Sequence, residues 1–115
     1  TLMVEAVMHG VQGQLDDAEP LLYDALRLYR QAGERDGEGM TRHNLGFLSK
    51  ERGDLAAARD HLLAAAAVFR ATRNAASAAL VFDDLAEVCD ALGDADAAAT
   101  ARRAAAASRA APRRR

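Results

Sequence analysis

The feature that most constrains this chain of 115 residues is a pattern that recurs three times at equal spacing. Glycines at positions 13, 53 and 93 define a period of 40, and each is followed, five positions later, by an alanine. Four positions further on, the first two units carry a leucine and the third an arginine. Self-similarity at a fixed period of roughly 20 to 50 residues is typical of repeat architectures. We therefore expect three copies of one supersecondary unit.

The composition excludes a protein built on β-sheets. The chain has no isoleucine, only six valines and 29 alanines. Strands favour β-branched and aromatic side chains, whereas Ala, Leu, Arg and Glu are strong helix formers. We therefore expect an all-α fold.

Each repeated glycine is interpreted as the end of one helix and the start of the next. Glycine can adopt the left-handed conformation that ends helices, and an aspartate after it can cap the following helix. In the first unit Asp16 and Glu19 have the spacing of a capping box, and Pro20 would fall in or near the first turn. Apolar residues recur at helical spacing on both sides of each glycine. The predicted helices span residues 2–12, 15–32, 38–52, 55–71, 76–92 and 95–110, and the polar stretches 33–39 and 72–75 separate the units.

The six helices form three antiparallel pairs in one domain, residues 1–111, with repeats at about 1–35, 36–74 and 75–111. A single pair cannot bury its apolar stripe, so neighbouring pairs are expected to stack around one core. The repeated alanines at 18, 58 and 98 would lie where the two helices of a pair cross. Residues 95–111 contain no Leu, Val or Phe, so the last helix would be either a solvated cap or a helix left exposed by truncation.

These residues resemble the tetratricopeptide repeat. The second unit carries the Leu45-Gly46 pair of the family fingerprint, followed by Ala58 and Leu62 at the family's spacing, and the third carries Leu85-Ala86 at the Leu-Gly position. The period of 40 exceeds the family's usual value of about 34, and the closing proline is absent. Such longer repeats are similar to those of bacterial regulators and signalling ATPases. The resemblance implies a right-handed α-solenoid of three helix-turn-helix repeats.

In this family the concave surface, lined mainly by the first helix of each pair, binds protein or peptide partners. The resemblance therefore implies a binding groove that runs from apolar to mixed to acidic. Its candidate residues are Met3, Val7, Met40, His43, Phe47, Lys50, Leu80, Asp83, Glu87 and Asp90.

Two of these assignments have a structural alternative. Asp83, Glu87 and Asp90 share one helix face, and like charges destabilise a helix when no cation is near. Either a basic partner segment binds them, or they form a solvated acidic face. Phe47 would be either a binding anchor or a core residue.

Charge and cysteine content limit the remaining function classes. Residues 1–100 carry a net charge of −8 and residues 101–115 carry +6. The acidic body argues against direct nucleic-acid binding, and the basic tail at 112–115 follows a last helix whose dipole its charges offset.

No apolar run approaches the ~20 residues of a membrane span. The lone Cys89 suits a reducing, cytoplasmic compartment. No export leader is recognised, and the start at Thr1 is consistent with a piece of a longer protein.

No catalytic, cofactor or metal signal is found. His9, His43 and His61 lie in different predicted helices and have no zinc-binding spacing. His9 is expected to be packed or at an edge, His61 to be exposed, and Cys89 to be a buried structural thiol. No phosphate-binding glycine loop is present. Asn44 could join Lys50 in clamping a peptide carboxylate, but the acidic third unit would repel one.

The sequence thus predicts a non-enzymatic scaffold that binds a protein or peptide without a cofactor. One alternative is a sensor of a small molecule or signalling peptide within a transcription regulator, which would need a closed pocket larger than ~300 Å³. Another is a homo-oligomerisation module in which the open end of the stack pairs between copies.

Overall fold

A computed structural model of the chain describes the backbone of residues 2–112 and the side chains of residues 16–112. The helices of this part are α1 (Leu2–Ala32), α2 (Arg35–Glu51), α3 (Leu55–Ala71), α4 (Ala75–Ala91) and α5 (Ala95–Ala110). The described residues contain no strand. The all-α prediction is confirmed, whereas the prediction of six helices is wrong.

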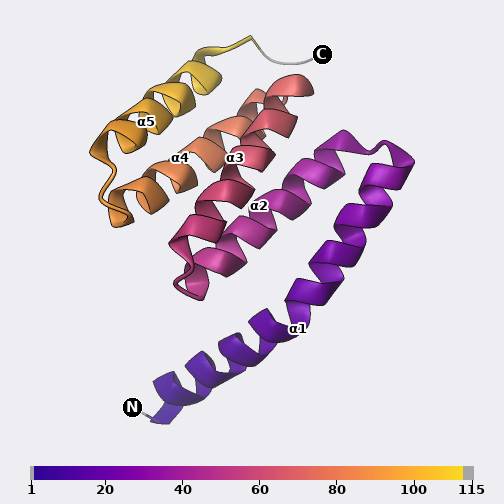
Figure 1. Cartoon of the computed structure of the whole chain (residues 1–115), viewed down its shortest axis with the longest axis vertical. Coiled ribbons are helices and arrows are strands. Elements are labelled where there is room, and N and C mark those ends of the chain that lie inside the picture. Colours follow the sequence, from indigo (N-terminus) through magenta and orange to yellow (C-terminus); the bar gives the residue numbers. More distant parts are fainter. Residues whose placement is uncertain (1, 113–115) are drawn as a thin grey trace.

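The helices lie side by side in chain order and each packs on the next (Figure 1). α2 and α3 form one antiparallel hairpin, and α4 and α5 form a second. The first hairpin's helices begin at positions 35 and 55, and those of the second begin at 75 and 95. Both starts are thus shifted by one full repeat period, so the period corresponds to a real structural unit in these two hairpins.

The predicted helix stops at Gly53 and Gly93 are confirmed. Both residues have a φ of 80°, which is the left-handed conformation that glycine adopts without steric cost. The aspartate after each glycine caps the next helix. Asp54 Oδ1 accepts a hydrogen bond from the Ala57 amide at 3.1 Å, and Asp94 Oδ1 accepts one from the Ala97 amide at 3.0 Å.

The same turn also recurs 20 residues before each of these glycines. Gly33 has a φ of 71° and Arg73 a φ of 59°, so a left-handed residue ends a helix at each of the positions 33, 53, 73 and 93. At the turn before α4 the cap is Asn74, whose side-chain oxygen accepts from the Ser77 amide at 3.2 Å. The hairpins and the connections between them therefore use one type of turn.

The first glycine behaves differently, because α1 continues through Gly13 as one helix of 31 residues. The prediction of separate helices at 2–12 and 15–32 is therefore wrong. Pro20 lies inside α1, where its ring and missing N–H favour a kink, and the ribbon of α1 changes direction along its length (Figure 1).

The predicted capping box of the first unit is also absent. An uninterrupted helix has no free N–H groups at this point for Asp16 and Glu19 to cap. Their carboxylates instead accept hydrogen bonds from Arg52 at the end of α2, and the bond to Asp16 measures 2.7 Å.

The start of α2 also differs from the prediction, because α2 begins at Arg35 and not at residue 38. Gly37 and Gly39 are part of the helix, where they make room for aromatic rings. A Cβ at Gly37 would lie 2.5 Å from the Tyr29 ring, and one at Gly39 would lie 2.8 Å from the Phe69 ring. The glycines that suggested a loop therefore serve close packing.

The core lies mainly between α3, α4 and α5. Ala58 and Ala98 are completely buried, in agreement with their predicted place at helix crossings, whereas Ala18 is only half-buried. The buried residues of α5 are Ala98, Ala101 and Ala105, and its other described side chains are exposed or half-buried. The exposure of this helix fits both alternatives, a solvated cap and a helix left exposed by truncation.

Candidate protein-binding surface

Exposed apolar side chains line one side of α2 and α4. Met40 and Leu80, which occupy equivalent positions in the two hairpins, are 59% and 57% exposed, and Phe47 is 56% exposed. The core alternative for Phe47 is thereby wrong, because this ring is exposed, and its role as a binding anchor stays a prediction. We call this surface the α2–α4 face, and define it by Met40, His43, Phe47, Lys50, Leu80, Asp84 and Glu87.

Two hydrogen-bonded pairs cross from α2 to α4 on this face. His43 Nε2 lies 2.6 Å from Asp84 Oδ2, and the Lys50 ammonium donates to Glu87 Oε2 at 2.7 Å. The bond from Lys50 and the negative charge of Glu87 raise the pKa of Lys50 above its ordinary value. Both pairs join positions about one repeat apart in sequence, so they connect the two hairpins at the surface.

Asp83 and Asp90, predicted as groove residues, are turned toward α5. Arg109 donates to both carboxylate oxygens of Asp83, and Arg102 donates to Asp90. The bond from Arg109 lowers the pKa of Asp83 below its ordinary value. Glu87 is paired with Lys50 as described above, so each of the three predicted acidic groove residues has a cation beside it.

This finding corrects the argument for a basic partner. A cation lies near each carboxylate of Asp83, Glu87 and Asp90, supplied by α2 for Glu87 and by α5 for the two aspartates. Because the charges are compensated within the chain, their presence needs no external partner to explain it.

The remaining predicted residues fall into two groups. The side chains of Met3, Val7 and His9 lie outside the described residues. Asn44 is exposed, but Lys50 is engaged by Glu87, so the two do not form a free carboxylate clamp.

Sequence reasoning missed Asp84, which binds His43 across the two hairpins. Asp84 lies one repeat after Asn44, the sequence neighbour of His43. This spacing was the available signal, since equivalent positions of neighbouring first helices lie close together.

His61 and Cys89 are structural. His61 was expected to be exposed, but it is half-buried. Its Nδ1 lies 3.3 Å from an Arg42 guanidinium nitrogen and its Nε2 lies 3.5 Å from the Tyr23 hydroxyl. Burial, followed by the charge of Arg42, lowers the pKa of His61. Cys89 is buried as predicted, and burial raises the pKa of its thiol, which keeps it protonated and unreactive.

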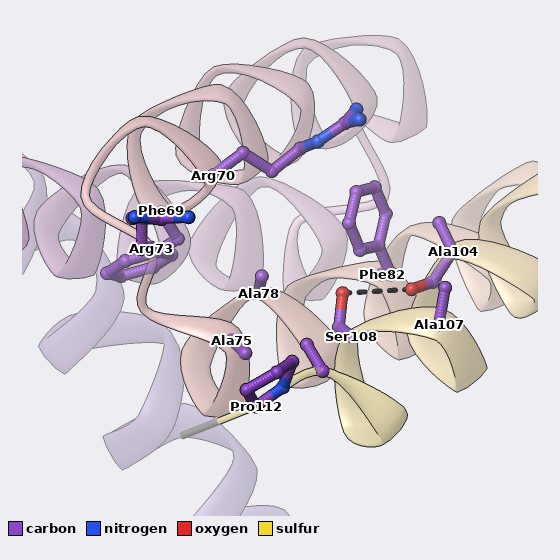
Figure 2. A pocket seen from close by; sticks show the side chains of 11 residues that line it. Phe69, Arg70, Arg73, Ala75, Ala78, Phe82, Ala104, Ala107, Ser108 and Pro112 are labelled. Atoms are coloured by element: carbon purple, nitrogen blue, oxygen red, sulfur yellow. Dashed lines mark hydrogen bonds between the residues drawn. The ribbon is translucent and has the colours of Figure 1, made fainter. Parts of the chain in front are cut away.

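An open cleft of about 710 Å³ lies elsewhere, between α3, α4 and α5. Figure 2 shows Phe69 and Arg73 at one end of it and Phe82 and Ala104 at the other. Alanines make up most of the remaining lining, and the Ser108 hydroxyl already donates to the Ala104 carbonyl at 2.9 Å. The cleft is larger than the sensor hypothesis requires, but it is not closed.

The described residues contain neither a candidate metal site nor a candidate membrane-spanning helix. No group of three or more His, Cys, Asp or Glu side chains among them is arranged to hold a metal ion. None of their helices combines the length and the apolar character needed to cross a membrane.

Three features of the structure agree with the family assignment that follows. They are the hairpins with a left-handed turn, the alanines at helix crossings and the contact of Gly46 with Leu62. The sequence model of the Tetratricopeptide repeat family matches residues 3–71. The chain belongs to the tetratricopeptide repeat family. Repeats of this family generally act as scaffolds for protein–protein interaction. No curated protein and no solved structure matches the chain.

Proposed function

We propose that this tetratricopeptide repeat chain is a non-enzymatic scaffold that binds a peptide segment of another protein on its α2–α4 face. The single observation that carries the proposal is the exposure of Met40, Phe47 and Leu80 on neighbouring first helices. Large apolar side chains clustered on a surface and bordered by polar groups are typical of protein-binding sites.

The arrangement of the face suggests how a peptide would be held. Met40 and Leu80 are exposed at equivalent positions near the starts of α2 and α4, and Phe47 lies two helical turns further along α2. Between them the His43–Asp84 pair spans the two helices. A bound segment would place apolar side chains against the two ends and polar groups over the middle.

Charge has a secondary role in this proposal. Lys50 and Glu87 neutralise each other, and Asp83 and Asp90 are held by arginines of α5. A basic partner segment would have to compete with these internal cations, so we expect apolar contacts to supply most of the affinity.

The proposal is tested with a displayed library of random peptides selected on the unmodified chain. Replacing both Phe47 and Leu80 by Ala should weaken the selected peptides at least tenfold, because truncating an interface anchor costs more than ~1 kcal/mol. The matched control is Leu63→Ala, since Leu63 is an exposed apolar residue on α3. Peptides that bind the double variant as well as the original chain would refute the α2–α4 face as the site.

A second variant separates the role of charge. Replacing both Glu87 and Asp90 by Lys should leave binding of apolar-anchored peptides within a few-fold. A large loss that diminishes at high salt would instead support a basic partner, because salt screens exposed charges.

The small-ligand alternative is supported by one observation, the cleft in Figure 2. Arg70 and Arg73 are among its lining residues, and neither forms an ion pair with another described residue. A small anion with an apolar body would suit this lining. Binding of such ligands that is lost in an Arg70→Ala, Arg73→Ala variant would favour this alternative. The cytoplasmic and bacterial setting stays a prediction from the sequence.

A further inference from the structure

The apolar side of α1 is less covered than the same side of α3. In the α2–α3 hairpin, three side chains of α3 pack against α2 and are at most 1% exposed. Their counterparts one repeat earlier, in α1, are half-buried or, for the tyrosine, 40% exposed. The three residues of α3 are Ala58, Leu62 and Phe69, and their counterparts are Ala18, Leu22 and Tyr29.

At Ala18 and Leu22 the difference arises because a helix is missing from this side, whereas the Tyr29 ring lies against Gly37 of α2. In both complete hairpins the covering helix is the one that precedes in sequence, α2 on α3 and α4 on α5. The corresponding segment of the first unit is residues 2–12. This segment carries Val4, Val7, Met8 and Val11 at helical spacing, and the family match begins within it, at residue 3.

Residues 2–12 cannot cover this side within the same chain, because α1 continues through Gly13 without a turn. In Figure 1 the N-terminal part of α1 extends away from the other helices. The two halves of α1 therefore complement each other. The first half has the repeat position of the missing covering helix, and the second half carries the apolar side that such a helix would cover.

We propose that the chain forms a domain-swapped dimer, in which residues 2–12 of each copy pack on residues 16–26 of the other. The occupant is a second copy because only this segment has the repeat position and the apolar spacing of the helix that is missing. The proposal is independent of peptide binding on the α2–α4 face.

The geometry of the complete hairpin predicts the pairing. A Cβ at Gly46 would lie 2.8 Å from Leu62 Cγ, so positions 46 and 62 face each other. One repeat earlier, this places Ala6 against Leu22. An antiparallel pair of helices with this alignment is symmetric about residue 14, so the reciprocal contact forms at the same time, as a two-fold interface requires.

The length of α1 is sufficient for this interface. A helix of 31 residues is about 46 Å long at ~1.5 Å per residue. With residue 6 opposite residue 22, residue 2 lies opposite residue 26, so the contact ends at Leu26, which is already only 4% exposed in the single chain. Swapping an identical element between copies is a low-cost route to a dimer because the packing already exists in the fold.

The dimer is tested first by sedimentation equilibrium of the unmodified chain. We expect twice the mass of one chain, which is 12.2 kDa. The mass of a single chain at all concentrations, up to those at which weak dimers assemble, would overturn the proposal. This measurement requires no variant.

Disulfide trapping then tests the swap itself. In a Cys89→Ala background, the single variants Ala6→Cys and Leu22→Cys are unfolded together, refolded and oxidised. We expect a covalent dimer in the mixture and none with either variant alone, because each disulfide needs one cysteine from each copy. Circular dichroism confirms that both variants fold.

In the matched control, Val7→Cys replaces Ala6→Cys. Phe47, which is equivalent to Val7 one repeat later, points outward, so a cysteine at position 7 should not cross-link to one at position 22. If the mixture gives no covalent dimer, while a chain carrying both Ala6→Cys and Leu22→Cys forms an internal disulfide, the segment folds back on its own chain and the swap is wrong.

Discussion

Gly46 illustrates how a single residue can be fixed by its neighbour across a hairpin. It is buried in α2, and a Cβ added there would lie 2.8 Å from Leu62 Cγ and 3.4 Å from the Ala58 carbonyl oxygen. In the next hairpin the equivalent residue is Ala86, and the residue opposite it is Arg102 instead of a leucine. The glycine of the family fingerprint is therefore needed where a branched side chain packs against it.

We expect Gly46→Ala to lower the free energy of unfolding by about 1 kcal/mol, and by no more than about 2 kcal/mol. Overpacking costs ~1–3 kcal/mol, and this exceeds the gain of up to ~1 kcal/mol from replacing a helical glycine. Urea denaturation measures the change. In a Leu62→Ala background the same substitution should no longer destabilise. A penalty that persists there would show that the contact with Leu62 is not its cause.

His61 makes stability depend on pH. An arginine side chain can only donate, so Nδ1 of His61 accepts from Arg42 and the neutral ring carries its proton on Nε2. Burial and Arg42 both lower the pKa of His61 in the folded chain, so the unfolded state takes up the proton first as pH falls. The stabilising contribution is thus present above about pH 6.5 and is lost as pH falls through the folded pKa.

We therefore expect the free energy of unfolding to decrease between about pH 7.5 and pH 5.5, and His61→Gln to reduce this slope. Denaturation curves at several pH values measure it. Arg42→Gln should reduce the slope less, because the charge of Arg42 is the smaller of the two causes. An unchanged slope in His61→Gln would mean that other groups are responsible.

Among the helices, α1 shows that one glycine pattern can have two outcomes. Gly53 has a φ of 80° and ends a helix, whereas Gly13, at the equivalent position, lies inside α1. Glycine permits the left-handed conformation but does not require it. Whether the turn forms depends on whether the two helices it would join pack against each other.

Alanine substitution at these two glycines should therefore have opposite effects. Gly13→Ala should stabilise the chain by roughly 0.5–1 kcal/mol, because glycine in a helix interior is unfavourable by that amount. Gly53→Ala should destabilise it by about 1–2 kcal/mol, since a side chain is strained in the left-handed region. Thermal and urea unfolding measure both. A loss of stability in both variants would indicate that a turn forms at Gly13.

At the scale of the whole molecule, the two complete hairpins are joined through the C-terminal end of α3. Phe69 is 1% exposed and lies against Gly39 of α2 as well as in the core shared with α4 and α5. The pairs from His43 to Asp84 and from Lys50 to Glu87 join the same hairpins at the surface. Surface pairs contribute little to stability, so the buried ring should dominate this connection.

We expect Phe69→Ala to lower the free energy of unfolding by about 3–5 kcal/mol, in a single transition with an unchanged dependence on urea. The control Leu63→Ala, at a side chain of the same helix that is 49% exposed, should change it by about 0.5 kcal/mol or less. Two separate transitions in Phe69→Ala would mean that the hairpins unfold independently.

The candidate site could be predicted only in part. The family resemblance implied its position on the first helices, and the repeat period adds that equivalent residues such as Met40 and Leu80 face the same side. The partners of its charges could not be predicted. Arg109 reaches Asp83 from another helix, and side chains from separate helices meet only at distances and angles that packing determines.

The sequence by itself determined the helical class, the period, the caps at Asp54 and Asp94 and the alanines at helix crossings. These depend on interactions within a few residues of one another or on repetition along the chain. The tertiary structure decided that α1 continues through Gly13, that Gly37 and Gly39 belong to α2 and that the acidic residues of α4 are paired. Each of these depends on which surface another helix covers, and local preferences of about 1 kcal/mol are too weak to fix it.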